Sequence, residues 1–187
     1  MVDYSTATHE AIPAPGIHVL GKYRPWGYHK QTRGPNSPWP ENCGKLLDLK
    51  ESRERGLIYF QKTLEEMIKQ GSPIALAVVP SHDALKLRSG IHILASRVAA
   101  AKGVLDTTDL LIRTKTIQKL AAGGDRSMAV HLGSMAAHKI ERLEGRQVLL
   151  LDDIMTTGNS LAAGRQVLIA AGAEEVACMA LGLTIHD

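Results

Sequence analysis

The stretch that most constrains this chain is residues 147–160, QVLLLDDIMTTGNS. Its four apolar residues, 148–151, predict a short strand that is buried on both faces. The strand ends at two adjacent acids, Asp152 and Asp153, and a Thr-Thr-Gly turn then leads into a helix that Gly172 ends. In an open α/β sheet, ligands bind beyond the carboxyl ends of such strands. The stretch therefore predicts a ligand site where the helix begins.

The chemistry of this turn indicates the class of ligand. The N–H groups and the positive dipole end of a helix N-terminus favour a phosphate. Carboxylates repel phosphate, but they suit sugar hydroxyls or a hard cation such as Mg²⁺. A phosphorylated sugar fits both halves of the turn.

The same residues resemble the phosphoribosyl diphosphate (PRPP) motif of type I phosphoribosyltransferases. That motif has four apolar residues, two acids, two variable residues, Thr-Thr-Gly, one variable residue and Ser or Thr, and residues 148–160 match it throughout. The resemblance implies that Asp152 and Asp153 are the catalytic pair, hold the ribose hydroxyls, and meet Mg²⁺ only indirectly, through ribose and pyrophosphate. It assigns the 5′-phosphate to Met155, Thr156, Thr157, Gly158, Asn159 and Ser160.

Two rival interpretations of the acidic strand fail on particular residues. A nucleotide hydrolase needs G-x-x-x-x-G-K-[ST]; in residues 16–23 the first seven positions match, but Tyr23 stands where the hydroxyl belongs. A receiver domain needs a late lysine, and no lysine follows Asp153. An ordinary turn with solvated acids would have to produce the whole pattern by chance.

Length and composition set the outer bounds. A chain of 187 residues predicts one domain with a substantial core. The formal charge of +3 suits an anionic substrate but is too weak to indicate nucleic acid. Cys43 and Cys178 are too few for a disulfide framework or a zinc site, and we expect Cys178 to be buried. With no apolar run of 18 residues, we expect a soluble, cytoplasmic protein without a membrane partner.

The chain divides into an N-terminal arm and a core that contains the motif. Residues 1–54 hold most of the prolines and both tryptophans, which predicts a weakly regular arm with one short strand near residues 16–21. This arm is either simply packed on the core or acts as the hood of the resembled family, with Trp26, Tyr28 and Trp39 stacking on an aromatic acceptor. Residues 55–187 are expected to form the phosphoribosyltransferase-like core.

Two loops of the core carry further candidates. A helix over 54–70 and a buried strand over 74–79 are followed by a loop, which the resemblance places on the pyrophosphate through Ser81, His82 and Arg88; a solvated loop is the alternative. After a helix over 91–102, a second core strand is expected over 108–113. The polar, glycine-containing segment beyond it resembles the family's lid, with Lys115, Lys119 and Arg126 as its cations, although a plain surface loop is as good an interpretation.

One subgroup is most similar in pattern. ComF-like phosphoribosyltransferases carry Arg, Thr, Gln and Arg at the spacing of Arg113, Thr116, Gln118 and Arg126. Those proteins usually begin with a cysteine zinc module, for which this chain offers only Cys43.

The remaining segments complete a fold prediction. Residues 128–132 are expected to form a short strand, 134–143 one or two helical turns and 175–183 the last strand. The resemblance covers roughly residues 55–185 and implies a three-layer α/β/α fold with a mainly parallel sheet. Because the resembled family commonly forms dimers, it also suggests a homodimer. The implied reaction is transfer of a phosphoribosyl group from PRPP to an unidentified acceptor, with Mg²⁺. The alternative is a regulator that binds PRPP or a nucleotide without catalysis, or a ComF-like protein linked to DNA uptake.

Overall fold

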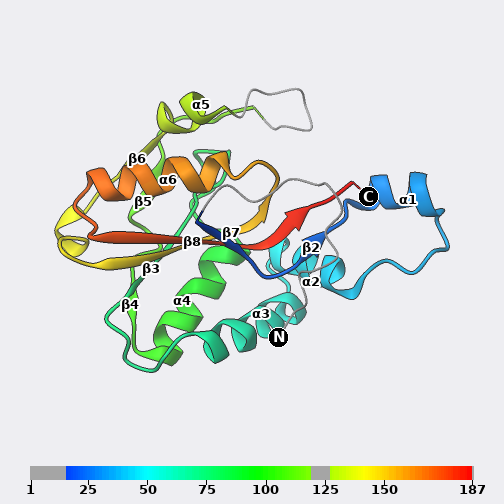
Figure 1. The fold of residues 1–187 in the computed structure, drawn as a ribbon, viewed down its shortest axis with the longest axis horizontal. Coiled ribbons are helices and arrows are strands. Elements are labelled where there is room, and N and C mark those ends of the chain that lie inside the picture. Colours follow the sequence, from blue (N-terminus) through cyan, green and yellow to red (C-terminus); the bar gives the residue numbers. More distant parts are fainter. Residues whose placement is uncertain (1–15, 119–126, 187) are drawn as a thin grey trace.

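A parallel β-sheet forms the middle layer of the protein (Figure 1). The computed structural model describes residues 16–118 and 127–186. The strand order is β1-β8-β7-β3-β4, β2 also pairs with β8, and every pairing in this sheet is parallel. The strands are β1 (Ile17–Val19), β2 (Lys22–Tyr23), β3 (Ala75–Val78), β4 (Leu105–Asp106), β7 (Gln147–Met155) and β8 (Glu175–Thr184).

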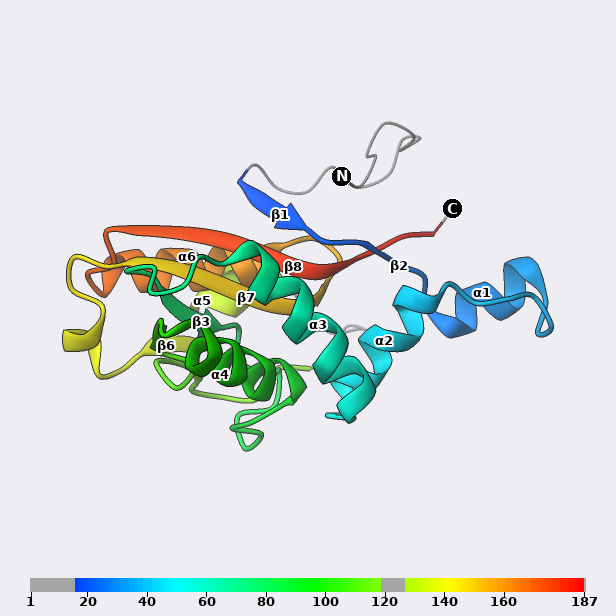
Figure 2. The same ribbon diagram turned by 90° about the horizontal axis from the view of Figure 1, so that it is seen from below.

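Helices cover both faces of this sheet. One face packs against α6 (Asn159–Ala170). The other packs against α2 (Glu41–Lys50), α3 (Glu54–Met67) and α4 (Gly90–Lys102), which Figure 2 shows side by side over the strands. This is the three-layer α/β/α arrangement with a mainly parallel sheet that the sequence predicted. Within the described residues, no helix is both long and apolar enough to span a bilayer.

The central strand β7 separates two hydrophobic clusters. Val148 and Leu150 belong to the cluster under α6, whereas Leu149 and Leu151 belong to the cluster under α3 and α4. Side chains alternate between the two faces of a strand, so a strand covered on both faces has an unbroken apolar run. The same reasoning applies to β8, where Cys178 is buried as expected.

Three predicted elements between residues 108 and 143 differ from the structure. Residues 111–113 form β5 (Leu111–Arg113), which pairs antiparallel with β6 (Met135–Ala137) in a separate small sheet, and β4 takes the expected place beside β3. Residues 128–132 form helix α5 (Met128–Leu132) because Ser127 caps it, its side chain accepting a hydrogen bond from the Val130 amide. The expected helix over 134–143 is limited to a 3-10 turn, η2 (Ile140–Arg142).

The N-terminal arm is more regular than expected. Besides β1 and β2 it contains α1 (Trp26–Arg33) and α2, and both strands extend the central sheet. Leu46 and Leu49 of α2 are fully buried in the same cluster as Leu76 of β3. The arm therefore contributes to the core, and a domain boundary after residue 54 stays a prediction.

Candidate functional site

The two acids of the motif lie inside β7 rather than after its end, which corrects the predicted boundary. The pairing of β7 with β3 stops at Leu151, opposite Val78, but its pairing with β8 continues to Met155, opposite Leu183. The strand therefore projects past β3, and Asp152 and Asp153 lie on the projecting part. This is the carboxyl edge of the sheet, where ligands of such folds bind.

Asp152 is buried and connects the strand to the next helix. Its exposed fraction is 9%. The Asp153 amide donates to its Oδ1 at 2.9 Å, and the Ser160 hydroxyl donates to its Oδ2 at 3.1 Å. Burial and the neighbouring Asp153 charge raise the pKa of Asp152 to about 8. A hydroxyl or a cation that arrives with a ligand would stabilise the charged form of a carboxyl group held in this way.

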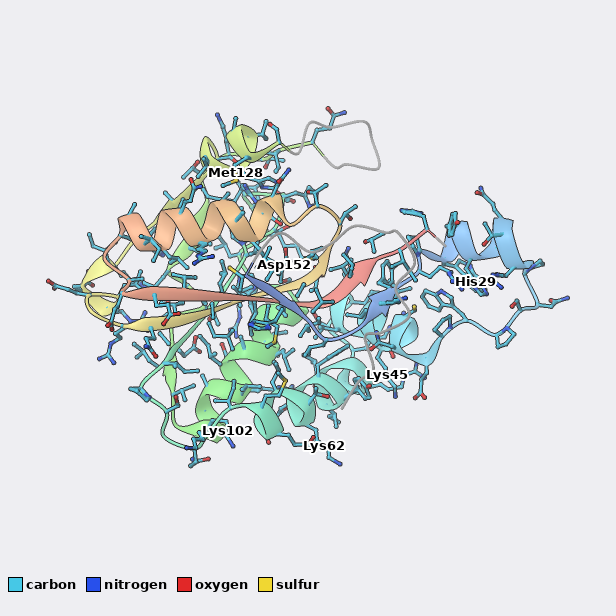
Figure 3. All side chains as sticks on the ribbon, in the orientation of Figure 1. His29, Lys45, Lys62, Lys102, Met128 and Asp152 are labelled. Carbon is cyan, nitrogen blue, oxygen red and sulfur yellow. The ribbon has the colours of Figure 1, made fainter. Side chains whose placement is uncertain are left out.

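The Thr-Thr-Gly turn brings the start of α6 to these acids. Gly158 has φ +80°, a left-handed conformation that favours glycine, and precedes the helix as its N-cap. The Thr157 hydroxyl accepts from the Asn159 amide at 3.4 Å, and the Thr156 hydroxyl donates to that of Thr184 on β8 at 3.2 Å. Figure 3 places Asp152 below the start of α6. The structure thus brings together the acids and the turn that the sequence selected.

Asp153 affects the pKa values of two residues that the sequence did not indicate, Tyr23 and His92. Burial is the main cause that raises the pKa of Tyr23 on β2, and the charges of Cys43 and Asp153 raise it further. Burial, then the charge of Arg88, lower the pKa of His92 on α4 to about 4, while Asp153 opposes this shift. His92 is buried, with its Nδ1 2.9 Å from the Ser89 hydroxyl. Only the pairing of β2 with β8 and the packing of α4 bring these residues to the acids, and neither is visible in the sequence.

The pyrophosphate loop was predicted over residues 80–90; in the structure it ends at residue 89, because α4 begins at Gly90. It begins beside the acids. The Val79 amide donates to the Leu151 carbonyl at 2.9 Å, so the loop leaves β3 next to Asp152. Ser81 and His82 are half-buried in its first part, and Arg88 is exposed near its end.

The predicted lid residues are only partly described. Lys115 is exposed on the segment that follows β5. Lys119 and Arg126 lie outside the described residues.

A comparison with known protein families finds one match to part of the chain. Residues 93–183 match the family model of the phosphoribosyl transferase domain. This segment belongs to the phosphoribosyltransferase family. Among curated proteins no match is found.

The matched part of the chain contains the acids, the turn and α6. Its pyrophosphate loop and its arm precede the matched residues, so their roles rest on position in the fold. The assignment of each site residue and the ComF-like subgroup stay predictions.

Aromatic rings of the arm gather next to the carboxyl edge of the sheet. Trp26 and Trp39 are 5.5 Å apart between ring centroids, and Trp39 also packs on Tyr23 at 6.4 Å. The Trp39 indole donates to the Arg24 carbonyl at 2.9 Å, whereas Tyr28 packs edge-on against His186. Tyr23, Trp26 and Trp39 thus pack on one another, but none of them is buried, and Trp26 is 41% exposed. Their stacking on an acceptor stays a prediction.

The donor set fits a metal that arrives with its substrate. Within residues 16–118 and 127–186, no group of three or more His, Cys, Asp or Glu side chains could hold a metal ion. Two adjacent carboxylates are too few to enclose Mg²⁺, which takes six oxygen ligands and usually keeps several from water and substrate phosphates. Oxygens of a pyrophosphate and a ribose would complete such a shell.

Proposed function

We propose that this protein transfers a 5-phosphoribosyl group from PRPP to a nucleophilic acceptor and releases pyrophosphate. The observation that carries the proposal is the 3.1 Å contact between Ser160 and Asp152. It holds a carboxylate pair, suited to ribose hydroxyls, against a helix N-terminus, suited to a 5′-phosphate. The family of residues 93–183 supports the same reaction class.

Each part of the site has a role in this proposal. The turn Thr156–Ser160 binds the 5′-phosphate, with Gly158 allowing the backbone to approach it. Asp152 and Asp153 hold the ribose hydroxyls. Ser81, His82 and Arg88 bind the diphosphate, to which arginine can donate two parallel hydrogen bonds.

The transfer step breaks the bond between ribose C1 and the diphosphate oxygen, which leaves with the electron pair. A new bond forms between C1 and the acceptor, which gives up its proton. Positive charge develops on the ribose as the old bond breaks, and the acids stabilise it because they already lie beside the ring. Bound Mg²⁺ would neutralise charge on the departing diphosphate. The acceptor and the group that takes its proton are left open.

The paired substitution Asp152→Asn with Asp153→Asn tests the binding half of the proposal. We expect the double variant to remain folded and to lose PRPP binding by at least about 100-fold, since two ribose contacts disappear. Isothermal titration calorimetry with PRPP and Mg²⁺ measures this. Asp109→Asn, which changes an exposed acid two residues before β5, is the control. Unchanged affinity in the double variant would refute the assignment of the acids.

Pyrophosphate release separates catalysis from regulation. The wild-type protein with Mg²⁺ and PRPP is assayed against a panel of nucleobases. We expect release with at least one of them, because the proposed transfer frees one pyrophosphate for each phosphoribosyl group. Binding of PRPP without any release would instead favour a regulator that has kept the site but not the reaction.

A further inference from the structure

A buried arginine lies behind the pyrophosphate loop. Arg113, on β5, is 7% exposed. Its Nε donates to the Ser81 carbonyl at 3.0 Å, and its Nη2 approaches the Pro80 carbonyl at 3.4 Å. The guanidinium group therefore contacts backbone oxygens at the start of the loop, at the point where the chain leaves β3.

The same arginine is anchored from the opposite side. Its Nη1 donates to the Ser134 hydroxyl at 2.7 Å, and that fully buried hydroxyl lies 2.6 Å from the Val130 carbonyl of α5. The Thr114 amide donates to the Ser134 carbonyl at 2.9 Å. Because the guanidinium fork is planar and held on two sides, it fixes the loop relative to the β5–β6 sheet.

The residues that follow Arg113 continue the contact along the loop. The Ile117 amide donates to the His82 carbonyl at 2.9 Å. The Thr116 hydroxyl accepts from the Ala84 amide at 3.0 Å and lies 3.4 Å from Asp83 Oδ1. From Pro80 to Ala84, each residue thus has a backbone or side-chain group held by the segment 113–117.

These contacts determine which way the loop backbone faces. In a trans peptide the C=O and the following N–H point in opposite directions. With the carbonyls of Pro80, Ser81 and His82 turned toward segment 113–117, the amides of the next residues turn away from it. Backbone amides on one side of a loop suit anionic oxygens. Of this row, the Asp83 amide already donates to the Ser81 hydroxyl at 3.2 Å. The positive charge of Arg113 behind the row favours an anion further.

We propose that Arg113 and Thr116 are positioning residues that hold the loop 80–84 in a diphosphate-binding shape. The inference rests on the proposed function and adds to it the residues that prepare the loop. Neither residue needs to touch the ligand. Their effect is expected on the diphosphate end of PRPP and not on its 5′-phosphate end.

Separate ligands for the two ends test this. Magnesium pyrophosphate reports on the loop 80–84, and ribose 5-phosphate reports on the turn before α6. We expect Thr116→Val to weaken binding of magnesium pyrophosphate by about tenfold while changing ribose 5-phosphate binding by less than about twofold. Arg113→Lys keeps the charge but loses the fork, and we expect the same selective loss. Thr114→Val, an exposed threonine on the same segment, is the matched control and should bind both ligands normally.

Hydrogen exchange of the ligand-free protein provides a second readout. Amides of residues 82–85 should exchange faster in Thr116→Val than in the wild type, and not in Thr114→Val. Thr116 is exposed, so its variant should fold even if Arg113→Lys does not. If the wild type binds both ligands and the variants bind them as well as the wild type does, the positioning role of Arg113 and Thr116 is refuted and the proposed function stands. A wild type that binds neither ligand would overturn both.

Discussion

At the scale of single residues, Asp152 lowers the stability of the folded protein but is well placed to bind a ligand. Its burial next to Asp153 raises its pKa, so the folded protein resists the charged form that the acid would take in water. Its neighbours Leu150 and Leu151 are buried hydrophobic residues. An acid retained at such a position is typical of a functional site, because the ligand and not the fold compensates for it.

The variant Asp152→Asn should therefore stabilise the ligand-free protein. The folded-state pKa of about 8 lies above the value of about 4 in an unfolded chain, so the wild type loses stability as the pH rises from about 4 to about 8. Asparagine has no such dependence. We expect the variant's Tm to exceed that of the wild type by roughly 3–8 °C at pH 8, with a smaller difference at pH 5. Thermal unfolding monitored by circular dichroism at both pH values measures it.

The variant Asp109→Asn is a control for which the expected change in Tm has the opposite sign. Burial raises the pKa of Asp109, but the hydrogen bonds and charges of Lys139 and Arg142 outweigh this and lower it overall. Asp109 thus contributes stability above the pKa of the unfolded chain, and this is lost as the pH falls. Asp109→Asn should lower the Tm at pH 8. A lower Tm for Asp152→Asn at pH 8 would contradict the burial account.

The sequence could predict site residues that share one continuous motif, and few others. Asp152, Thr157 and Ser160 follow one another along a strand and a turn, so local spacing determines how they meet. The charge of Asp153 affects the pKa values of Tyr23 and His92 only because strand pairing and helix packing bring distant segments together. A single sequence carries no signal for such long-range interactions.

At the scale of elements, the end of α2 and the start of α4 approach each other very closely. A Cβ atom built on Gly90 would lie 1.6 Å from the Leu49 carbonyl oxygen. Only glycine permits this approach, and it brings the arm directly against the residue that follows the pyrophosphate loop. The position of α4, and with it that of His92, depends on this contact.

Gly90→Ala should be strongly destabilising. The clash is with backbone, so either α2 or α4 must move, and we expect a loss of about 3 kcal/mol or more, or failure to fold. Gly27→Ala in α1 is the matched control, because its Cβ would have no atom within 4 Å. Alanine there should stabilise slightly, by about 0.5 kcal/mol. Urea unfolding measures both, and equal stability of the two variants would refute the contact.

Elements were predictable where burial on both faces produced an unbroken apolar run, as in β7, β8 and β3. The helices of the arm were missed because α1 mixes aromatic, polar and glycine residues and prolines precede both α1 and α2. The strand 111–113 was assigned to the wrong sheet for another reason. Its apolar residues fit either a parallel or an antiparallel partner, and only β6, which lies more than 20 residues further along the chain, determines the choice.

At the scale of the whole molecule, the arm and the core share strands and a hydrophobic cluster. β2 pairs with the end of β8 next to Thr184, which bonds the Thr156 hydroxyl of the site. Leu46 and Leu49 are buried with Leu151 of β7. Loss of the arm would therefore expose the face of the sheet on which Leu151 lies.

The arm and the core should therefore unfold in one step. Both tryptophans of the chain, Trp26 and Trp39, belong to the arm, so their fluorescence reports on the arm alone, while circular dichroism at 222 nm reports on all helices. In a urea titration we expect the two signals to give the same midpoint and the same m-value, as a two-state transition requires. The variant Trp26→Phe leaves only Trp39, which bonds Arg24 beside β2, and excludes fraying of α1 as the source of the signal. A fluorescence midpoint clearly below that of circular dichroism would instead establish a separate N-terminal unit and favour a boundary near residue 54.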